Sequence, residues 1–396
     1  MAMVTRRPRG STLKASKGAD MARRWTINGR FLSQPTTGVQ RYAREVVRSL
    51  DALIAEQGPL ARGLKVALHC PPGSEEFPLA AIGRREIGGK SGHVWEQTQL
   101  PSSLGGGGLL SLCNTGPLLC RKHIVCIHDA NVWNAPQSYS LAFRGLYRAL
   151  LPCLGRTAWR ISTVSDYSLR ELTGHGVVPA QRAFVAPNGH EHALRWKPAH
   201  SAGTRLAASR ETVVMIGSAA PHKNVGLVLD MAERLAAAGL RIAIVGMSDS
   251  RVFRSGSTGA KGQNVHWLGR ISDGELAALL GDSLCLAFPS LTEGFGLPAL
   301  EAMAIGCPVV VSDRASLPEV CGNAALFAPP DDPEAWFDRF MRLRASESLR
   351  LQMTGKGRAR ASAYSWRATA LHYLEAMAIA DGIDTAAKIV RVRELT

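Results

Sequence analysis

The chain has 396 residues, 46% of them apolar and 6% aromatic, with a formal net charge of +15. This length allows two domains of ordinary size with a sizeable core. It has no apolar run of about 18 residues and no apolar leader, which excludes a transmembrane helix and a signal peptide. Its eight scattered cysteines form no CxxC pair, so we expect reduced thiols in a cytoplasmic protein.

Residues 1–24 carry seven basic residues and one acid, with no apolar run. We expect a disordered tail, a mis-annotated start, or an arm that binds phosphate or a membrane surface. The basic balance continues into the rest of the chain. It suits nucleic acid, anionic lipid or phosphorylated substrates and does not choose among them.

The first half of the chain alternates strand and helix patterns. A strand at 25–33 runs through a Gly38 turn into an amphipathic helix at 39–53, and the four glycines at 105–108 predict a flexible loop. Further strands are predicted at 65–70, 123–129, 160–166 and 183–189, with helices at 138–155 and from 165.

Residues 190–210 lack periodicity and predict a linker, after which the alternation restarts. Strands are predicted at 212–217, 241–246, 264–269, 284–290 and 307–313, and helices at 224–238, 272–280, 333–346 and 366–380. Strands that alternate with helices indicate parallel sheets. We therefore predict an α/β protein with two doubly wound Rossmann-like domains, at 25–195 and 205–365, facing each other across a cleft.

Open parallel sheets bind ligands at the carboxyl ends of their strands, and polar residues follow several predicted strands. Lys223 precedes a predicted helix, where it and free backbone N–H groups suit phosphate; an exposed lysine near a helix cap is the alternative. Gly38 allows close approach of a phosphate, or is an ordinary turn glycine. His128 follows a strand and is a substrate contact or a structural histidine.

The segment from Glu293 to Asp313 reads EGFGLPALEAMAIGCPVVVSD. In the run Gly294, Phe295, Gly296 and Leu297, the glycines leave room for sugar or phosphate oxygens against the backbone. Glu293 is then placed to accept hydrogen bonds from hydroxyls. Glu301, on the following helix, suits the two hydroxyls of a ribose, or is a solvent-facing acid.

Several familiar motifs are missing. There is no D-x-D triad, no Walker-type or GxGxxG loop, and no zinc spacing of cysteine and histidine. This favours a diphosphate site without a metal or cofactor, built from Lys223 and helix dipoles.

The Glu293–Asp313 segment resembles the E-x7-E signature of retaining glycosyltransferases of family 4, which have the GT-B fold. PHKN (221–224), VSDYSLREL (164–172), VAPNG (185–189), WEQTQLP (95–101), IHD (127–129) and YSW (364–366) resemble other segments of that family. The resemblance covers nearly the whole chain after residue 25. It implies that residues 366–396 are helices that pack back toward the N-terminal domain.

The resemblance also implies roles for single residues. Glu293 would contact the donor sugar, Glu301 the ribose and Lys223 the diphosphate. His128 would approach the sugar, the Gly38 loop the phosphates, and Arg270 the base. Gly217 and Ser218 belong to the same donor site. Many family members have an arginine where this chain has Ser218, which puts the donor affinity in question.

The implied activity is a metal-independent, retaining hexosyltransferase of cell-surface polysaccharide synthesis. GDP-mannose is the favoured donor, and the acceptor is a saccharide that is growing or linked to a polyprenyl diphosphate. We expect a cytoplasmic enzyme with peripheral contact to the anionic inner membrane face. Sugar-nucleotide epimerase, phosphorylase and nucleic-acid binder are the alternatives. The last lacks a known binding module or interleaved aromatic and basic residues.

Overall fold

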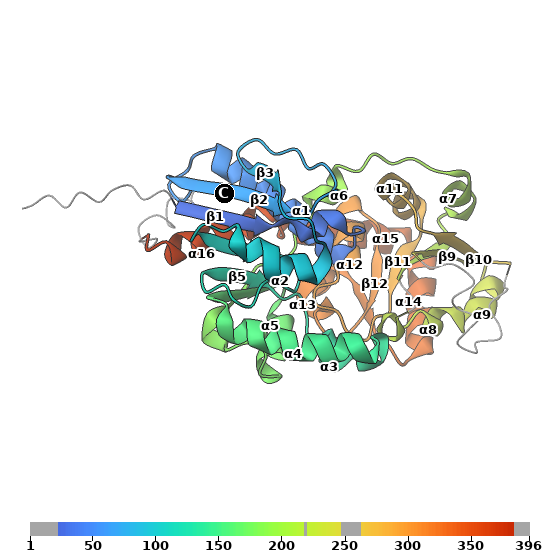
Figure 1. The fold of residues 1–396 in the computed structure, drawn as a ribbon. Coiled ribbons are helices and arrows are strands. Elements are labelled where there is room, and N and C mark those ends of the chain that lie inside the picture. The colour runs from blue at the N-terminus through green and yellow to red at the C-terminus, as the bar shows by residue number, and fades with distance from the viewer. Residues whose placement is uncertain (1–22, 218–219, 247–262, 384–396) are drawn as a thin grey trace, which may run out of the picture.

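A computed structural model describes residues 23–217, 220–246 and 263–383 of the chain. Figure 1 shows two parts side by side, one formed by the first half of the chain and the other by most of the second half. Each part is a parallel sheet with helices packed on it. The predicted fold class, two doubly wound α/β domains, is confirmed. No helix of the described residues is long and apolar enough to cross a membrane.

The N-terminal sheet, in the described residues, has seven parallel strands in the order β3-β2-β1-β4-β5-β6-β7. The strand order reverses between β1 and β4, and such switch points are where ligand-binding loops diverge. The strands are β1 (Arg23–Asn28), β2 (Leu64–Cys70), β3 (Gly83–Glu86), β4 (Gly108–Ser111), β5 (His123–Cys126), β6 (Arg160–Thr163) and β7 (Ala183–Val185).

The helices of this domain turn an apolar face to the sheet. Tyr42, Val46 and Leu50 of α1 recur at helical spacing and are buried, as the pattern predicts. The helices are α1 (Gly38–Ala55), α2 (Gly92–Ser102), α3 (Asn131–Asn134), α4 (Leu141–Thr157), α5 (Asp166–Gly174) and α6 (Glu191–Leu194), with 3₁₀ turns η1 (Gly29–Ser33), η2 (Pro136–Ser138) and η3 (Ala180–Arg182).

The C-terminal sheet, among the described residues, has six parallel strands in the order β10-β9-β8-β11-β12-β13. They are β8 (Thr212–Ile216), β9 (Arg241–Val245), β10 (Val265–Gly269), β11 (Cys285–Phe288), β12 (Val309–Ser312) and β13 (Leu326–Ala328). The strands are mostly apolar because helices cover both faces. These helices are α7 (Ala202–Ala207), α8 (Gly226–Leu229), α9 (Ala232–Ala237), α11 (Asp273–Asp282), α12 (Leu297–Ile305), α13 (Leu317–Cys321), α14 (Pro333–Ala345) and α15 (Glu347–Ser362), with 3₁₀ turns η4 (Pro221–Lys223) and η6 (Gly322–Ala324).

The last described helix, α16 (Trp366–Ala380), returns to the N-terminal domain and packs against α1 (Figure 1). The hydroxyl groups of Tyr42 and Tyr373 share a hydrogen bond of 2.7 Å in the buried contact. Beyond the helix, Asp381 accepts hydrogen bonds from Arg23 at 2.6 Å and from the Trp25 indole at 3.1 Å. The C-terminal segment is thereby attached to β1, the first described strand.

Two predictions about flexible segments differ from the structure. Residues 1–22 lie outside the described residues, but Arg23 and Arg24 begin β1 and therefore do not belong to a tail. The glycines at 105–108 are not a loop throughout, because Gly108 is the first residue of β4. A Cβ atom would lie 2.7 Å from the Arg24 carbonyl oxygen on Gly107 and 2.6 Å from the Trp25 ring on Gly108, so these two glycines allow close packing.

Several element boundaries also differ. The helix predicted at 224–238 is two short helices, α8 and α9, and the predicted linker at 190–210 contains α6 and α7. The strand β3 and the helices α2 and α15 were not predicted. Each is short or has few buried residues, so its sequence lacks a clear periodic pattern of apolar residues. The helices predicted at 333–346 and 366–380 are confirmed within one residue.

Candidate active site

The structure joins two of the predicted site residues directly. The Lys223 ammonium group donates a hydrogen bond of 2.7 Å to Oε1 of Glu293, with side chains 21% and 11% exposed. The pair lies on the carboxyl side of β8 and β11, which are neighbours in the C-terminal sheet. The two residues predicted to contact the diphosphate and the sugar are thus adjacent in the structure.

Lys223 is positioned by the short segment after β8. Lys223 is the last residue of the 3₁₀ turn η4, and the next residue, Asn224, has a left-handed conformation with φ of 52°. The Asn224 amide donates to the Pro330 carbonyl at 2.7 Å, which fixes this turn. The ammonium group also lies 5.4 Å from the centre of the Phe288 ring, a cation–π distance. Gly217 precedes the turn and donates its N–H to Val245 O, whereas Ser218 lies outside the described residues.

Glu293 begins the loop that leads into α12. The Ser316 hydroxyl donates to the Glu293 carbonyl at 2.9 Å, which holds the main chain of the loop. Phe295 is buried edge-on against Tyr364, and Gly296 has φ of 96° at the N-cap of α12. The N-terminal turn of α12, starting at Leu297, leaves N–H groups without partners inside the helix and directs its positive dipole end toward this loop.

The same loop makes the contact with the N-terminal domain. The Gly294 carbonyl accepts hydrogen bonds from the hydroxyls of Ser165 at 2.6 Å and Ser168 at 3.0 Å. A Cβ atom on Gly294 would lie 2.7 Å from the His128 carbonyl oxygen, too close for any side chain. A Cβ atom built on Gly38, in the N-terminal domain, would lie 4.0 Å from Cδ2 of Leu297, an ordinary van der Waals distance. Gly294 thus lies directly against the His128 backbone, and Gly38 lies near Leu297, across the domain boundary.

Gly294→Ala is expected to push the two domains apart at this contact, because the blocking atom is a backbone oxygen that cannot rotate away. We expect donor consumption to fall about tenfold, as a small misplacement of reacting groups would cause. Steady-state kinetics and a melting curve measure the two effects. Gly226→Ala is the matched control, because a Cβ atom there meets nothing within 4 Å. Equal activity of the two variants would contradict the role assigned to this contact.

Asp129 is a site residue that the predicted set of donor contacts did not include. It follows His128 at the end of β5, and its Oδ1 accepts a hydrogen bond of 2.9 Å from the Asn131 N–H. Burial and the nearby Glu293 carboxylate raise the pKa of Asp129 above its ordinary value. Lys223 therefore has a second carboxyl group nearby, and burial disfavours the charged form of that group.

The ring of His128 does not point at the Lys223–Glu293 pair. Its Nε2 is 2.9 Å from the Leu112 carbonyl, so this nitrogen carries the proton and donates, and the ring packs edge-on against Tyr42 at 4.8 Å. The backbone of His128, rather than its ring, lines the contact with Gly294. In this arrangement the His128 ring packs as a structural histidine inside the N-terminal domain. Contact of the ring with a sugar requires a different side-chain position.

Glu301 is held by partners from other segments. Its Oε1 lies 2.8 Å from His192 Nε2 and 3.6 Å from Arg41 Nε. The Trp366 indole N–H donates to His192 Nδ1 at 2.9 Å, so Nε2 of that histidine carries the proton and donates to Glu301. The first residue of α16 therefore orients Glu301 through His192. Among the described residues, no hydrogen bond is made by Oε2 of Glu301, so this oxygen is open to a further donor.

Arg41 is a further site residue that sequence patterns did not indicate, and His222 lies within the PHKN motif but was given no role. Arg41 of α1 forms a two-pronged ion pair with Asp273 in addition to its contact with Glu301, and so bridges the domains. Burial, and then the neighbouring Lys223, lower the pKa of His222, whose Nδ1 lies 2.8 Å from the Ser138 hydroxyl. Arg270 is exposed at the end of β10, an edge strand, and no contact joins it to the other site residues among the described parts of the chain.

Comparison with known families decides the kind of site. Residues 197–360, which include Lys223, Glu293 and Glu301, match the family described as glycosyl transferases group 1. The chain contains a domain of the group 1 glycosyltransferases. Among the described residues of this glycosyltransferase, no group of three or more His, Cys, Asp or Glu side chains is arranged to hold a metal ion.

Curated relatives of this glycosyltransferase include mannosyltransferases. It is 29% identical over 274 residues to O-antigen chain mannosyltransferase B of Escherichia coli, covering 63% of this chain and 68% of that protein. It is 30% identical over 287 residues to MMP alpha-(1->4)-mannosyltransferase of Mycolicibacterium hassiacum, covering 67% and 66%.

Solved structures share the fold at low sequence identity. Sucrose-phosphate synthase of Thermosynechococcus elongatus superposes with a TM-score of 0.65 at 18% identity, over 88% of this chain and 96% of that one. WaaG, a glycosyltransferase involved in lipopolysaccharide biosynthesis, gives 0.63 at 14% identity, over 89% and 99%. The glycosyltransferase therefore has the GT-B arrangement of two Rossmann-like domains.

Proposed function

We propose that this glycosyltransferase transfers a hexose, with mannose favoured, from a nucleotide sugar to a saccharide of cell-surface polysaccharide synthesis. The acceptor is a growing saccharide chain or a saccharide linked to a polyprenyl diphosphate. The reaction retains the anomeric configuration of the sugar and needs no metal. The observation that carries the proposal is the Lys223–Glu293 pair, 2.7 Å apart beside the N-terminus of α12 and the loop that contacts the other domain.

The choice of sugar is supported by the relatives. Two of them, from Escherichia coli and Mycolicibacterium hassiacum, are named as mannosyltransferases, and the first acts on O-antigen chains by its name. The base of the donor has two candidates. If the sugar is mannose, we favour GDP as its nucleotide. UDP is the other candidate, because Anabaena Alr3699/HepE, which shares the fold at 14% identity, was solved in complex with UDP and glucose.

The chemistry follows from the charges at the site. Breaking the bond between the sugar and the diphosphate leaves negative charge on the departing phosphate oxygen. Lys223 and the N–H groups at the start of α12 stabilise that charge, and they are in place before the reaction begins. Glu293 holds sugar hydroxyls so that the acceptor oxygen attacks from the same face as the leaving group. The departing phosphate then takes the acceptor proton.

Binding of the donor must rearrange the pair. The Lys223 ammonium group already donates one hydrogen bond to Glu293, and a bound diphosphate offers it a second anionic acceptor. Glu293 is then free to turn to the sugar hydroxyls.

A screen of nucleotide sugars tests the proposal. The full chain is heated with UDP-, GDP- and dTDP-linked hexoses, and hydrolysis of each is followed in parallel. We expect the largest rise in melting temperature and the fastest hydrolysis with GDP-mannose. A selective response to a UDP-sugar would replace the donor and keep the reaction class. The absence of any response, with the protein folded, would contradict a sugar-transfer function.

A further inference from the structure

One face of the N-terminal domain combines arginines with exposed leucines and lies outside the donor site. We call it the α4 face. It comprises the outer side of α4, the loop before β5 and one residue of η3, with the following members: Leu119, Arg121, Leu141, Leu146, Arg148, Arg156 and Arg182. In Figure 1, α4 lies along one edge of the molecule.

Charge is segregated on this stretch of chain. Between Gly116 and Ser165 there are six lysines and arginines and a single acid, Asp129, which belongs to the cleft. In the described residues, no carboxylate lies within ion-pair distance of Arg148, Arg156 or Arg182. Exposed arginines elsewhere are often paired, as Arg367 is with Glu56. The α4 face therefore presents positive charge that the protein itself does not neutralise.

The apolar side chains on this face are unusually open to solvent. Leu119 is 93% exposed, Leu141 78% and Leu146 50%. Leu141 and Arg148 lie two turns apart on α4, so leucine and arginine share its outer side. A helix that exposes leucines among arginines, without acids, has the composition of an element that lies in the interface of an anionic membrane.

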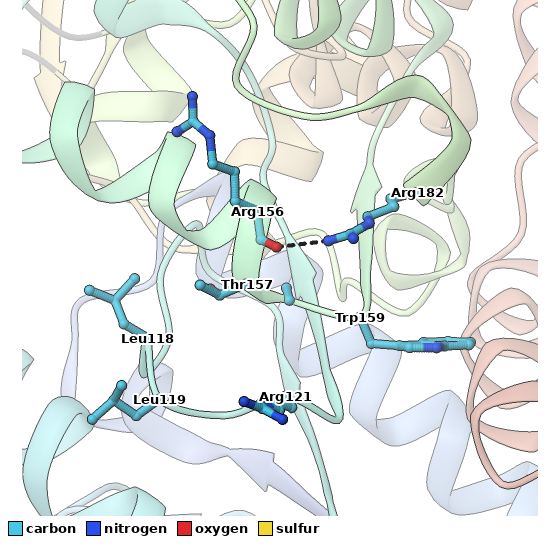
Figure 2. Close-up of a pocket in the computed structure, with 8 residues that line it drawn as sticks. Leu118, Leu119, Arg121, Arg156, Thr157, Trp159 and Arg182 are labelled. Carbon is cyan, nitrogen blue, oxygen red and sulfur yellow. Dashed lines mark hydrogen bonds between the residues drawn. The ribbon is translucent and has the colours of Figure 1, made fainter.

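A cavity of about 780 Å³ opens at the C-terminal end of α4. Figure 2 shows Leu119 and Arg121 on the loop at one side, with Arg182 on the other side reaching the Arg156 carbonyl. Trp159 also lines this cavity. Arginines beside leucine and an indole ring match a phosphate headgroup and the upper part of the chains attached to it.

The other end of α4 is next to the donor site. Ser138, in the turn before α4, is hydrogen-bonded to His222, the neighbour of Lys223. The helix has 17 residues and is therefore roughly 25 Å long. The α4 face thus extends from the cavity to the edge of the candidate active site.

We propose that the α4 face docks on an anionic lipid bilayer, with the leucines in the interface and the cavity holding a phospholipid headgroup. Exposed leucines among the arginines favour a lipid surface over nucleic acid, which offers no apolar interface to them. Docking in this way places the start of α4, and the cleft beside it, close to the headgroups. This deepens the proposed function, because a lipid-linked acceptor would enter the cleft from that side.

Vesicle sedimentation with the full chain tests this docking without any sugar transfer. We expect the protein to pellet with phosphatidylcholine vesicles that contain about one third phosphatidylglycerol, and not with pure phosphatidylcholine. The triple variant Arg148→Glu, Arg156→Glu, Arg182→Glu should bind at least about 100-fold more weakly, since each basic residue near the surface adds attraction. Leu119→Ser should weaken the binding that remains at high salt, where the charge contribution is screened.

The matched control has the same change in net charge on other surfaces: Lys197→Glu, Arg205→Glu and Lys356→Glu, all exposed. It should bind vesicles like the unmodified chain. Equal loss in both triple variants, binding to neutral vesicles, or retention by duplex DNA in place of vesicles would overturn the proposal. A melting-temperature shift with GDP-mannose in every variant shows an intact donor site. If no chain shows a shift with any of the nucleotide sugars in the screen, the proposed function fails while the vesicle result still decides the docking.

Discussion

Lys223→Ala is expected to lower kcat/KM for donor consumption by about 10²–10³-fold, the range for removing one preorganised donor to a developing negative charge. The variant loses the cation 2.7 Å from Glu293 and leaves that carboxylate and Asp129 facing the diphosphate without it. The melting temperature should also fall, because the Glu293 side chain is only 11% exposed and is left without its cation. Steady-state kinetics on the donor selected by the screen measures the effect.

The matched control for this variant is Lys356→Ala, an exposed lysine on the C-terminal domain that should leave kcat/KM unchanged. Glu293→Gln should also lower the rate, and the double variant Lys223→Ala, Glu293→Gln should cost less than the sum of the single losses. Additive losses would mean that the two side chains act independently, which contradicts a single sugar–diphosphate site.

Asp381→Ala is expected to lower the free energy of unfolding by about 3–5 kcal/mol, the cost of breaking a buried ion pair by removing one partner. Asp381 accepts hydrogen bonds from Arg23, Lys122 and the Trp25 indole, and its side chain is only 3% exposed. Without it, the guanidinium group of Arg23, whose side chain is 8% exposed, has no carboxylate. Urea unfolding followed by tryptophan fluorescence measures the change.

The pair Glu56–Arg367 gives the control, because it also joins α16 to the N-terminal domain but is exposed. Glu56→Ala should cost less than about 1 kcal/mol. If both variants lose a similar free energy of unfolding, the buried Asp381–Arg23 pair is no more important than the exposed Glu56–Arg367 pair, and the prediction is wrong. Donor consumption by folded Asp381→Ala should stay near normal, since no site residue contacts Asp381.

The fold could be predicted from the sequence because its signals are local. Buried parallel strands such as β8 and β12 are continuous apolar runs, and α1 has an apolar face at helical spacing. The sequence did not reveal β3 or α15, where exposed polar residues dominate, nor the break between α8 and α9. There, packing and turn geometry decide the structure, and a periodic pattern does not record them.

The candidate site was predictable only within each strand-loop-helix unit. The motifs indicated Lys223, Glu293 and Glu301, and the structure brings the first two into direct contact. Contacts between distant segments were not visible, so Arg41 and His192 were missed although both hold Glu301. His128 shows the opposite limit: its place at a strand end was foreseen, but its ring faces the core of the N-terminal domain. The direction of a side chain depends on packing that one segment does not determine.

Calorimetric titration of GDP and GDP-mannose tests the central claim, that Lys223 holds the diphosphate and Glu293 the sugar of one donor. Lys223→Ala should weaken both ligands by at least about tenfold, because it removes a charge-assisted contact to the part they share. Glu293→Gln should leave GDP affinity within about twofold and remove the difference between GDP-mannose and GDP. If both ligands bind the two variants as they bind the unmodified chain, the donor is held elsewhere and the account is wrong.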